Sequence, residues 1–184
     1  MWKLIILVIF YSCTDSILYD PLKLNSIQLN DNAWIHIKND IDDQNDISII
    51  DDKFTLEFWF TGGNTGTSKS ACLVSIIGDN GEIDFGLFKD PNLANELEIW
   101  IDDTRLESVE LNINGDLNSG DVFHHIAITS NEITQIYFNG NLIKTLAQKI
   151  EINDNDLVIA GKVNRNLSVL DNFWIGNIDE MRLW

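Results

Sequence analysis

The sequence predicts an all-β fold in which two antiparallel sheets pack face to face as a sandwich. Apolar and polar residues alternate in many short segments, which is the pattern of half-buried strands. Turn residues separate these segments at intervals of roughly 8–12 residues, as in β-sandwiches. No convincing helical periodicity extends beyond two turns. The 184 residues are enough for one domain with a substantial core.

The predicted strands follow one another with short polar links. The clearest covers residues 54–60, where Phe54, Leu56, Phe58 and Phe60 share one face and Trp59 lies on the other. Each large apolar side chain contributes roughly 1.5–3 kcal/mol when fully buried, so a charge at Phe58 should unfold the domain. The other strands are expected at residues 26–29, 33–37, 72–77, 83–88, 96–101, 123–129, 133–138, from 142 onward, 157–160, 172–174 and 175–184.

Residues 122–145 give the strongest local signal. In this segment His124, Ile126 and Ile128 alternate with residues that face the other way. Asn139-Gly140 supplies the two positive-φ residues of a type I′ hairpin. Because His124 and His125 are neighbours on a strand, their rings point to opposite faces and cannot bind one metal ion together.

Three segments, in the expected order, resemble one protein family. Residues 122–145 resemble the W-H-H-V-A-V-T … L-Y-V-N-G-K-L-V core of laminin G-like jelly rolls, with Phe123 at the usual Trp position. Residues 54–60 resemble the early f-t-l-e-F-W-f strand, and residues 175–184 the final G-x-I-D-E-V-R-I-W strand. The resemblance covers residues 25–184 and implies a jelly-roll sandwich of the concanavalin A-like lectin/glucanase group.

The first residues predict an export signal rather than part of the fold. Residues 1–12 hold a short basic start and an apolar run too short to span a bilayer permanently. Ser12-Cys13 after this run resembles the lipobox of bacterial lipoproteins, which implies lipid attachment at Cys13 and a tether over residues 13–24. The alternative is an ordinary signal peptide with an incidental cysteine. We therefore expect a protein of the bacterial envelope surface, or a secreted one, whose contact with the membrane is through the lipid.

The charge balance limits the classes of partner. There are 12 Lys and Arg against 29 Asp and Glu, a net charge of −17, which disfavours nucleic acid and anionic lipid. Cations or neutral sugars suit such a surface better, and the simplest interpretation is an acidic surface that keeps the protein soluble. Cys72, the only cysteine besides Cys13, lies in an apolar run and is expected as a buried hydrophobic residue.

No catalytic residue is predicted. The glucanases of the group carry Glu-x-Asp-x-Glu or Glu-x-Asp-x-x-Glu on a strand, which places two carboxylates about 5–5.5 Å apart in a retaining enzyme. The nearest match, Glu82-Ile83-Asp84, has Gly86 and Leu87 where the second glutamate should stand. Glu96 and Glu98 share a strand face but lack a third carboxylate. A glycoside hydrolase is the least favoured function.

Calcium is the one cofactor that we expect, in a structural role. Acidic loops offer the hard oxygen ligands that calcium prefers, although residues 40–46 lack the glycine, glutamate and helices of an EF-hand. The family resemblance implies a calcium site at the sandwich rim, which we place at Asp31 and Asp179. The alternative role for Asp179 is a hydrogen bond that fixes the last strand.

Together these features predict a non-catalytic, surface-anchored module that binds a glycan or an extracellular protein, as in adhesion. We name no sugar-binding residue, because at least half of the tryptophans in strands are usually core. The alternative is a structural domain or fragment of a larger envelope protein without a small ligand, since Trp184 ends the sequence inside a predicted strand.

Overall fold

The computed structural model describes residues 26–29, 34–37, 53–62, 70–78, 81–90, 92–93, 95–111, 117, 122–152, 156–163, 170–171 and 173–184. Residues 1–24, with the predicted signal, tether and Cys13, lie outside these ranges, as does Asp31. Every regular element in the described ranges is a strand. Their bounds are β1 (Ile27–Leu29), β2 (Ile35–Ile37), β3 (Phe54–Phe60), β4 (Ala71–Ile77), β5 (Ile83–Lys89), β6 (Glu96–Ile101), β7 (Thr104–Glu110), β8 (His124–Ser130), β9 (Thr134–Phe138), β10 (Asn141–Leu146), β11 (Asp156–Ile159), β12 (Lys162–Val163), β13 (Leu170–Asp171) and β14 (Gly176–Leu183).

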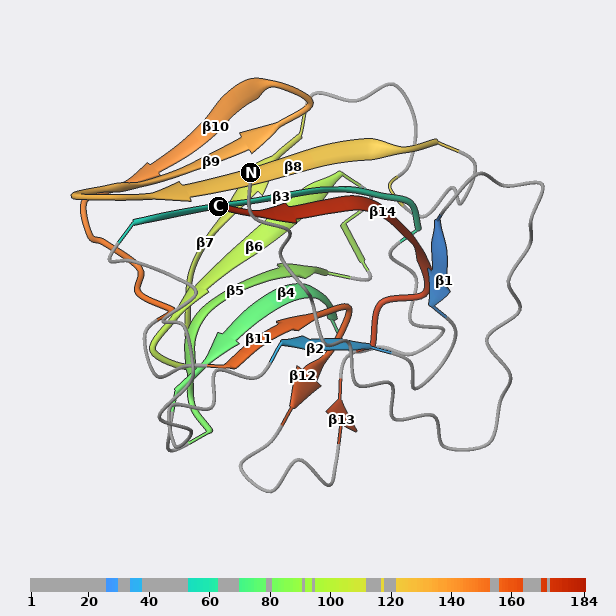
Figure 1. Cartoon of the computed structure of the whole chain (residues 1–184), viewed down its shortest axis with the longest axis horizontal. Helices are drawn as coiled ribbons and strands as arrows, with labels where there is room; N and C mark the ends of the chain where they lie inside the picture. Colours follow the sequence, from blue (N-terminus) through green and yellow to red (C-terminus); the bar gives the residue numbers. More distant parts are fainter. Residues whose placement is uncertain are drawn as a thin grey trace, which may run out of the picture.

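Two six-stranded antiparallel sheets form the sandwich (Figure 1). Sheet A has the order β1-β14-β3-β8-β9-β10, and sheet B has the order β2-β11-β4-β5-β6-β7. A small ribbon of β12 and β13 lies beside β11 (Figure 1). The predicted all-β jelly-roll sandwich is confirmed. In the described ranges, no helix is long and apolar enough to cross a membrane.

The core lies between the two sheets and follows the alternation of the sequence. In β3 and β8 every second residue is buried, so Phe58 and Ile126 face inward while Glu57 and Ala127 face outward. In β4, by contrast, all residues are buried, including Cys72 as predicted. The inward-facing buried residues of both sheets form one large apolar cluster, which the hydrophobic effect stabilises in proportion to its area.

The hairpin predicted at Asn139-Gly140 is present. Asn139 has φ 48° and Gly140 has φ 77°, as a type I′ turn requires. Asn139 N donates to His125 O at 2.8 Å, and His125 N donates to Asn139 Oδ1 at 2.8 Å. The side chain of Asn139 therefore closes the hairpin against the start of β8.

One strand was not predicted, and one predicted strand is absent. Strand β7 was not predicted, because it is an edge strand with mostly polar, largely exposed side chains, so no apolar alternation marks it. Phe173 and Trp174 were expected in a strand but lie outside one. Trp174 instead is fully buried, its Nε1 donates to Thr61 O at 2.8 Å, and its ring meets that of Phe60 edge-on at 5.3 Å.

Strand β14 contains an irregularity that matters for the outer face. Asp179 pairs with Trp59, and Arg182 pairs with Glu57, so three steps along β14 match two steps along β3. Glu180, within this bulge, has φ 47°, and its N donates to Asp179 Oδ1 at 2.8 Å. The extra residue reverses the alternation, so that Arg182 and Trp184 are exposed.

Candidate functional site

The outer faces of the two sheets differ in exposure. On sheet A, the outward side chains of β3, β8 and β9 are polar or aromatic, except for Ala127, and all are at least partly exposed. Sheet B carries a second buried apolar cluster, separate from the main core, on Cys72, Ile77, Ile83, Phe88 and Val158, with Trp34 and Trp100 packed against it. The face of sheet A is therefore the accessible one among the described strands.

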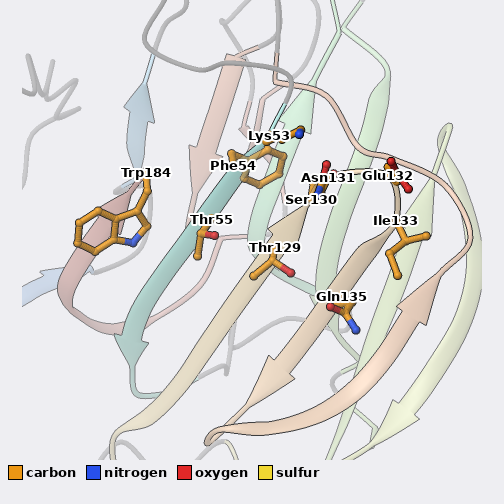
Figure 2. A pocket seen from close by; sticks show the side chains of 10 residues that line it. All are labelled: Lys53, Phe54, Thr55, Thr129, Ser130, Asn131, Glu132, Ile133, Gln135 and Trp184. Carbon is orange, nitrogen blue, oxygen red and sulfur yellow. The ribbon is translucent and has the colours of Figure 1, made fainter.

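A groove of about 550 Å³ lies at one end of this face (Figure 2). It is bounded by the start of β3, the turn between β8 and β9, and the residue after β14. Its lining residues are Lys53, Phe54, Thr55, Thr129, Ser130, Asn131, Glu132, Ile133, Gln135 and Trp184.

The floor of the groove is a single row across three strands. Thr55 pairs with Thr129, and Thr129 pairs with Gln135. Trp184 joins the row, because Trp184 N donates to Thr55 O at 3.0 Å and Thr55 N donates to Trp184 O at 3.2 Å. Figure 2 shows the indole, the two hydroxyls and the amide side by side across the strands. Trp184 is 68% exposed.

Buried hydrogen bonds fix the end wall of the groove. Ser130 Oγ donates to Ile150 O at 2.8 Å and accepts from Ile150 N at 2.9 Å. The turn is closed by Asn131 N, which donates to Ile133 O at 3.1 Å. Tyr137 donates its hydroxyl to Gln135 Oε1 at 3.2 Å, which orients the Gln135 amide nitrogen as a donor. A shaped concave site with a few placed polar groups is typical of small-ligand binding.

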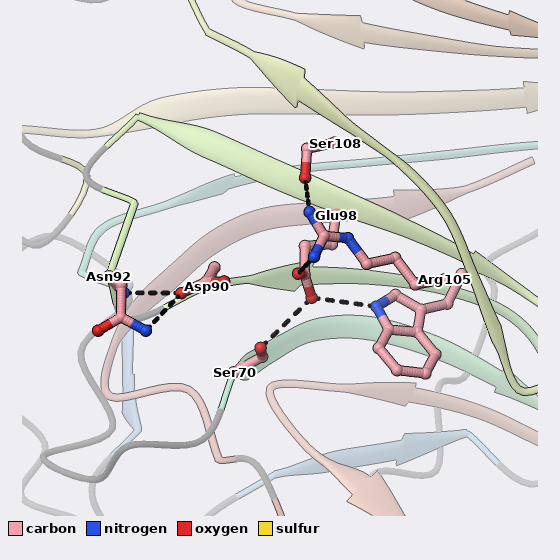
Figure 3. A network of polar contacts seen from close by, with 7 residues as sticks. Ser70, Asp90, Asn92, Glu98, Arg105 and Ser108 are labelled. Carbon is pink, nitrogen blue, oxygen red and sulfur yellow. Dashed lines mark hydrogen bonds and ion pairs between the residues drawn. The ribbon is translucent and has the colours of Figure 1, made fainter.

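A second polar cluster surrounds Glu98 on sheet B (Figure 3). Glu98 is 3% exposed, and its Oε1 lies 3.0 Å from Arg105 Nη1. Its Oε2 accepts from Trp100 Nε1 at 3.1 Å and from Ser70 Oγ at 3.3 Å. Arg105 also donates to the hydroxyl of Ser108. Both carboxylate oxygens are thus used within the protein, so this cluster joins β6, β7 and the start of β4.

The two adjacent histidines lie on opposite faces, as predicted. His124 is buried, stacks on Phe138 with 5.3 Å between ring centroids, and its Nδ1 lies 3.3 Å from Asn139 Nδ2. Burial lowers the pKa of His124 below its ordinary value, because desolvation disfavours the charged imidazolium. His125 faces outward, where its ring lies 5.1 Å from that of Trp59.

The structure describes one of the two residues predicted to bind calcium. Asp179 accepts the hydrogen bond from Glu180 N described above, which corresponds to the alternative structural role. Within the described ranges, no group of three or more His, Cys, Asp or Glu residues is placed to hold a metal ion. Calcium binding at Asp31 and Asp179 and lipid attachment at Cys13 stay predictions.

The groove itself was not predicted from the sequence. Trp59 was correctly placed opposite the apolar face of β3, and it is 39% exposed. The position of Trp184 beside Thr55, however, depends on the pairing of strands far apart in the chain. Thr55 and Thr129 could have indicated the groove only if the register between β3 and β8 had been known.

Solved structures support the architecture. The carbohydrate-binding module CBM40 of the Ruminococcus gnavus IT-sialidase, bound to α2,6 sialyllactose, matches with a TM-score of 0.55 and 17% identity over 72% of this chain and 76% of that one. The receptor-binding domain of botulinum neurotoxin mosaic serotype C/D matches with a TM-score of 0.58 and 15% identity over 96% of this chain and 42% of that one. A heptameric SAP-like pentraxin from Limulus polyphemus matches with a TM-score of 0.51 and 12% identity over 72% and 63%.

At these identities the structural likeness shows the fold alone. The chain spans less than two thirds of the pentraxin and less than half of the toxin domain. No curated protein sequence matches this chain significantly. A family profile described as "Concanavalin A-like lectin/glucanases superfamily" matches residues 29–184, which is most of the sequence. The chain therefore belongs to the concanavalin A-like lectin/glucanase superfamily, as its three sequence segments and its two-sheet sandwich both indicate.

Proposed function

We propose that this protein is a non-catalytic carbohydrate-binding module and that the groove on sheet A holds a sugar. The observation that carries this proposal is the exposed indole of Trp184 beside the row of Thr55, Thr129 and Gln135. An indole offers a flat apolar face against which a pyranose ring can stack. The two hydroxyls and the amide can exchange hydrogen bonds with sugar hydroxyls at the ring edge.

The charge of the protein favours neutral sugars. The net charge of −17 repels carboxylated and sulfated glycans at long range. The CBM40 structure was solved with sialyllactose, which supports a sugar-binding role for this fold. Neutral polysaccharides are therefore the first ligands to test.

A protein partner is the second candidate, and one observation favours it. Leu106 in β7 and Leu142 in β10 are 55% and 51% exposed on edge strands of the two sheets. These edges are neighbours, because Lys144 Nζ lies 2.5 Å from Glu107 Oε1. Exposed apolar side chains at open sheet edges are suited to contact with another chain.

The test of sugar binding is affinity electrophoresis of the purified protein through gels that contain xylan, mannan, laminarin, glycogen or hydroxyethylcellulose, with pectin and alginate as acidic comparisons. At least one neutral polysaccharide should retard the protein, and Trp184→Ala should abolish the retardation. Leu106→Ala, an exposed apolar residue on the other sheet, is the matched control and should behave as the wild type. Unchanged mobility in every gel, with and without calcium, would contradict the proposal.

The proposed location is the bacterial envelope, with Cys13 as the lipid anchor. A radiolabelled fatty acid fed to cells that express the protein should be incorporated, and Cys13→Ala should abolish this and release the protein in soluble form. Labelling that persists in Cys13→Ala would contradict the anchor without affecting the assignment of the groove.

A further inference from the structure

The row in the groove is the first of several parallel rows on the outer face of sheet A. Glu57 pairs with Ala127, which pairs with Tyr137, and Trp59 pairs with His125. Trp59 is four residues from Thr55 on the same strand, which corresponds to about 13 Å at 3.2–3.4 Å per residue. The outer face therefore extends from the groove to a second exposed tryptophan.

Small side chains lie along β8 between the groove and the row of Trp59 and His125. Thr129 and Ala127 face outward at successive positions of β8, and both are partly exposed. Larger side chains stand on either side, with Glu57 on β3 and Tyr137 on β9. Ala127, with only a methyl group, is the smallest side chain of this row.

The end of this face away from the groove carries an exposed aromatic pair. Trp59 is 39% exposed, and its ring contacts that of His125 at 5.1 Å with a 54° interplanar angle. This contact, together with the pairing of Trp59 with Asp179 on β14, limits the positions of the indole. A pre-positioned ring loses little entropy when a ligand stacks on it.

Between the two tryptophans, Arg182 is paired with two carboxylates. Glu57 Oε1 lies 3.0 Å from Arg182 Nη1, and Glu57 Oε2 lies 3.6 Å from His125 Nε2. Arg182 Nη2 also lies 3.2 Å from Glu180 Oε2. Because the guanidinium is already paired with carboxylates, it is not available as a strong partner for an acidic sugar.

We propose that the outer face of sheet A binds an extended, neutral oligosaccharide that runs from the groove, which contains Trp184, towards Trp59, with the two indoles as stacking surfaces. This inference rests on the proposed sugar-binding function and goes beyond it, because the rise of about 13 Å from Thr55 to Trp59 along β3 exceeds the span of a single sugar ring. Linked sugar units would lie over Thr129 and Ala127, beside the hydrogen-bonding groups of Gln135 and Tyr137.

The experiment is isothermal titration calorimetry of the purified protein with gluco-, xylo- and manno-oligosaccharides, from disaccharide to hexasaccharide. The affinity for the bound series should rise with chain length until both tryptophans are reached. Trp59→Ala should weaken hexasaccharide binding by about tenfold or more, as expected for an aromatic anchor, and leave disaccharide binding unchanged. Trp184→Ala should weaken both.

A larger side chain at Ala127 is an independent test. Ala127→Ile keeps a residue suited to a strand but raises the surface between the groove and the pair of Trp59 and His125. It should weaken hexasaccharide binding and spare disaccharide binding, while Leu106→Ala should change neither. Circular dichroism and the melting temperature of each variant check that the fold is kept.

The outcomes separate this inference from the proposed function. If affinity is the same at every length, and Trp59→Ala and Ala127→Ile have no effect while Trp184→Ala does, the groove binds a short sugar and the extended site is wrong. If oligosaccharides bind but neither tryptophan variant matters, both assignments to this face are wrong. If no oligosaccharide or polysaccharide binds, the proposed function itself is wrong.

Discussion

The two sheets use the same strand architecture but have opposite outer faces. The outer face of sheet A is polar, aromatic and accessible, as in β3, where every second residue is at least partly exposed. The outer face of sheet B is largely buried, as in β4, where no residue is exposed. Regular alternation of apolar and polar residues indicates a strand with one solvent-exposed face, whereas a continuous apolar run indicates a strand that is buried on both faces. The sequence pattern thus distinguishes the face available for binding from the covered one.

The largest effect should come from the core side of β3. Phe58 is fully buried, so Phe58→Ala should lower the free energy of unfolding by about 3–5 kcal/mol, and a charged residue should prevent folding. Trp59→Ala, one residue away on the outer face, should cost less than about 1.5 kcal/mol. Urea denaturation followed by circular dichroism measures both. Equal losses at the two positions would mean that the two faces of sheet A are not distinguished by burial.

The next largest effect on stability should distinguish the ion pair of Glu98 on sheet B from that of Glu57 on sheet A. Glu98→Gln removes a buried carboxylate from Arg105, Trp100 and Ser70, and should destabilise the fold by about 1–3 kcal/mol. Glu57→Gln on sheet A weakens a more exposed pair with Arg182, which is worth about 0–1 kcal/mol. Urea unfolding at low and high salt should show a larger and less salt-dependent loss for Glu98→Gln. The reverse order would show that the Glu98 cluster is not a stabilising one.

The pH dependence of stability should distinguish the two histidines. Because burial lowers the pKa of His124 in the folded state, the unfolded chain binds the proton more tightly. Stability is therefore complete above the ordinary pKa of 6.5 and falls as the pH drops below it towards the lowered folded-state pKa. His124→Gln should reduce the slope of melting temperature against pH in this range, with His125→Gln as the control on the other face. A wild-type slope that persists in His124→Gln would contradict this.

The smallest expected effect concerns calcium at the rim. If Asp179 binds calcium together with Asp31, a chelator should lower the melting temperature of the wild type, since ligand release removes binding energy from the folded state. Asp179→Ala should remove this sensitivity. A melting temperature that is indifferent to both chelator and added calcium would leave Asp179 with only its hydrogen bond to Glu180.

Local patterns in the sequence predicted most of the fold. Strand β3 was predicted with its observed bounds, and the Asn139-Gly140 hairpin with its turn type, because both depend on residues that are close in the chain. Strand β7 was missed because its side chains face solvent at a sheet edge. Trp174 was wrongly assigned to a strand, because aromatic residues are common in strands and the sequence does not distinguish them from an aromatic residue of a loop that packs into the core.

The candidate site was less accessible to prediction, because it depends on register. Thr55 and Thr129 become neighbours only when β3 pairs with β8, and Trp184 joins them only through its pairing with Thr55. Side-chain alternation shows which face each residue occupies but not which residue of another strand lies beside it. The face of Trp59 was therefore predictable, whereas the groove was not.

The bulge in β14 has a consequence for how this surface can change. The segment between Asp179 and Arg182 holds one residue more than the facing segment of β3, and this alone turns Trp184 to the same side as Trp59. Deleting one residue there would turn every later side chain of the strand to the opposite face of the sheet. The indole of Trp184 would then point inward and Leu183 would point to solvent. Whether the ring of Trp184 lies on the same surface as Trp59 therefore depends on the length of the segment between Asp179 and Arg182, as well as on the amino acid at position 184.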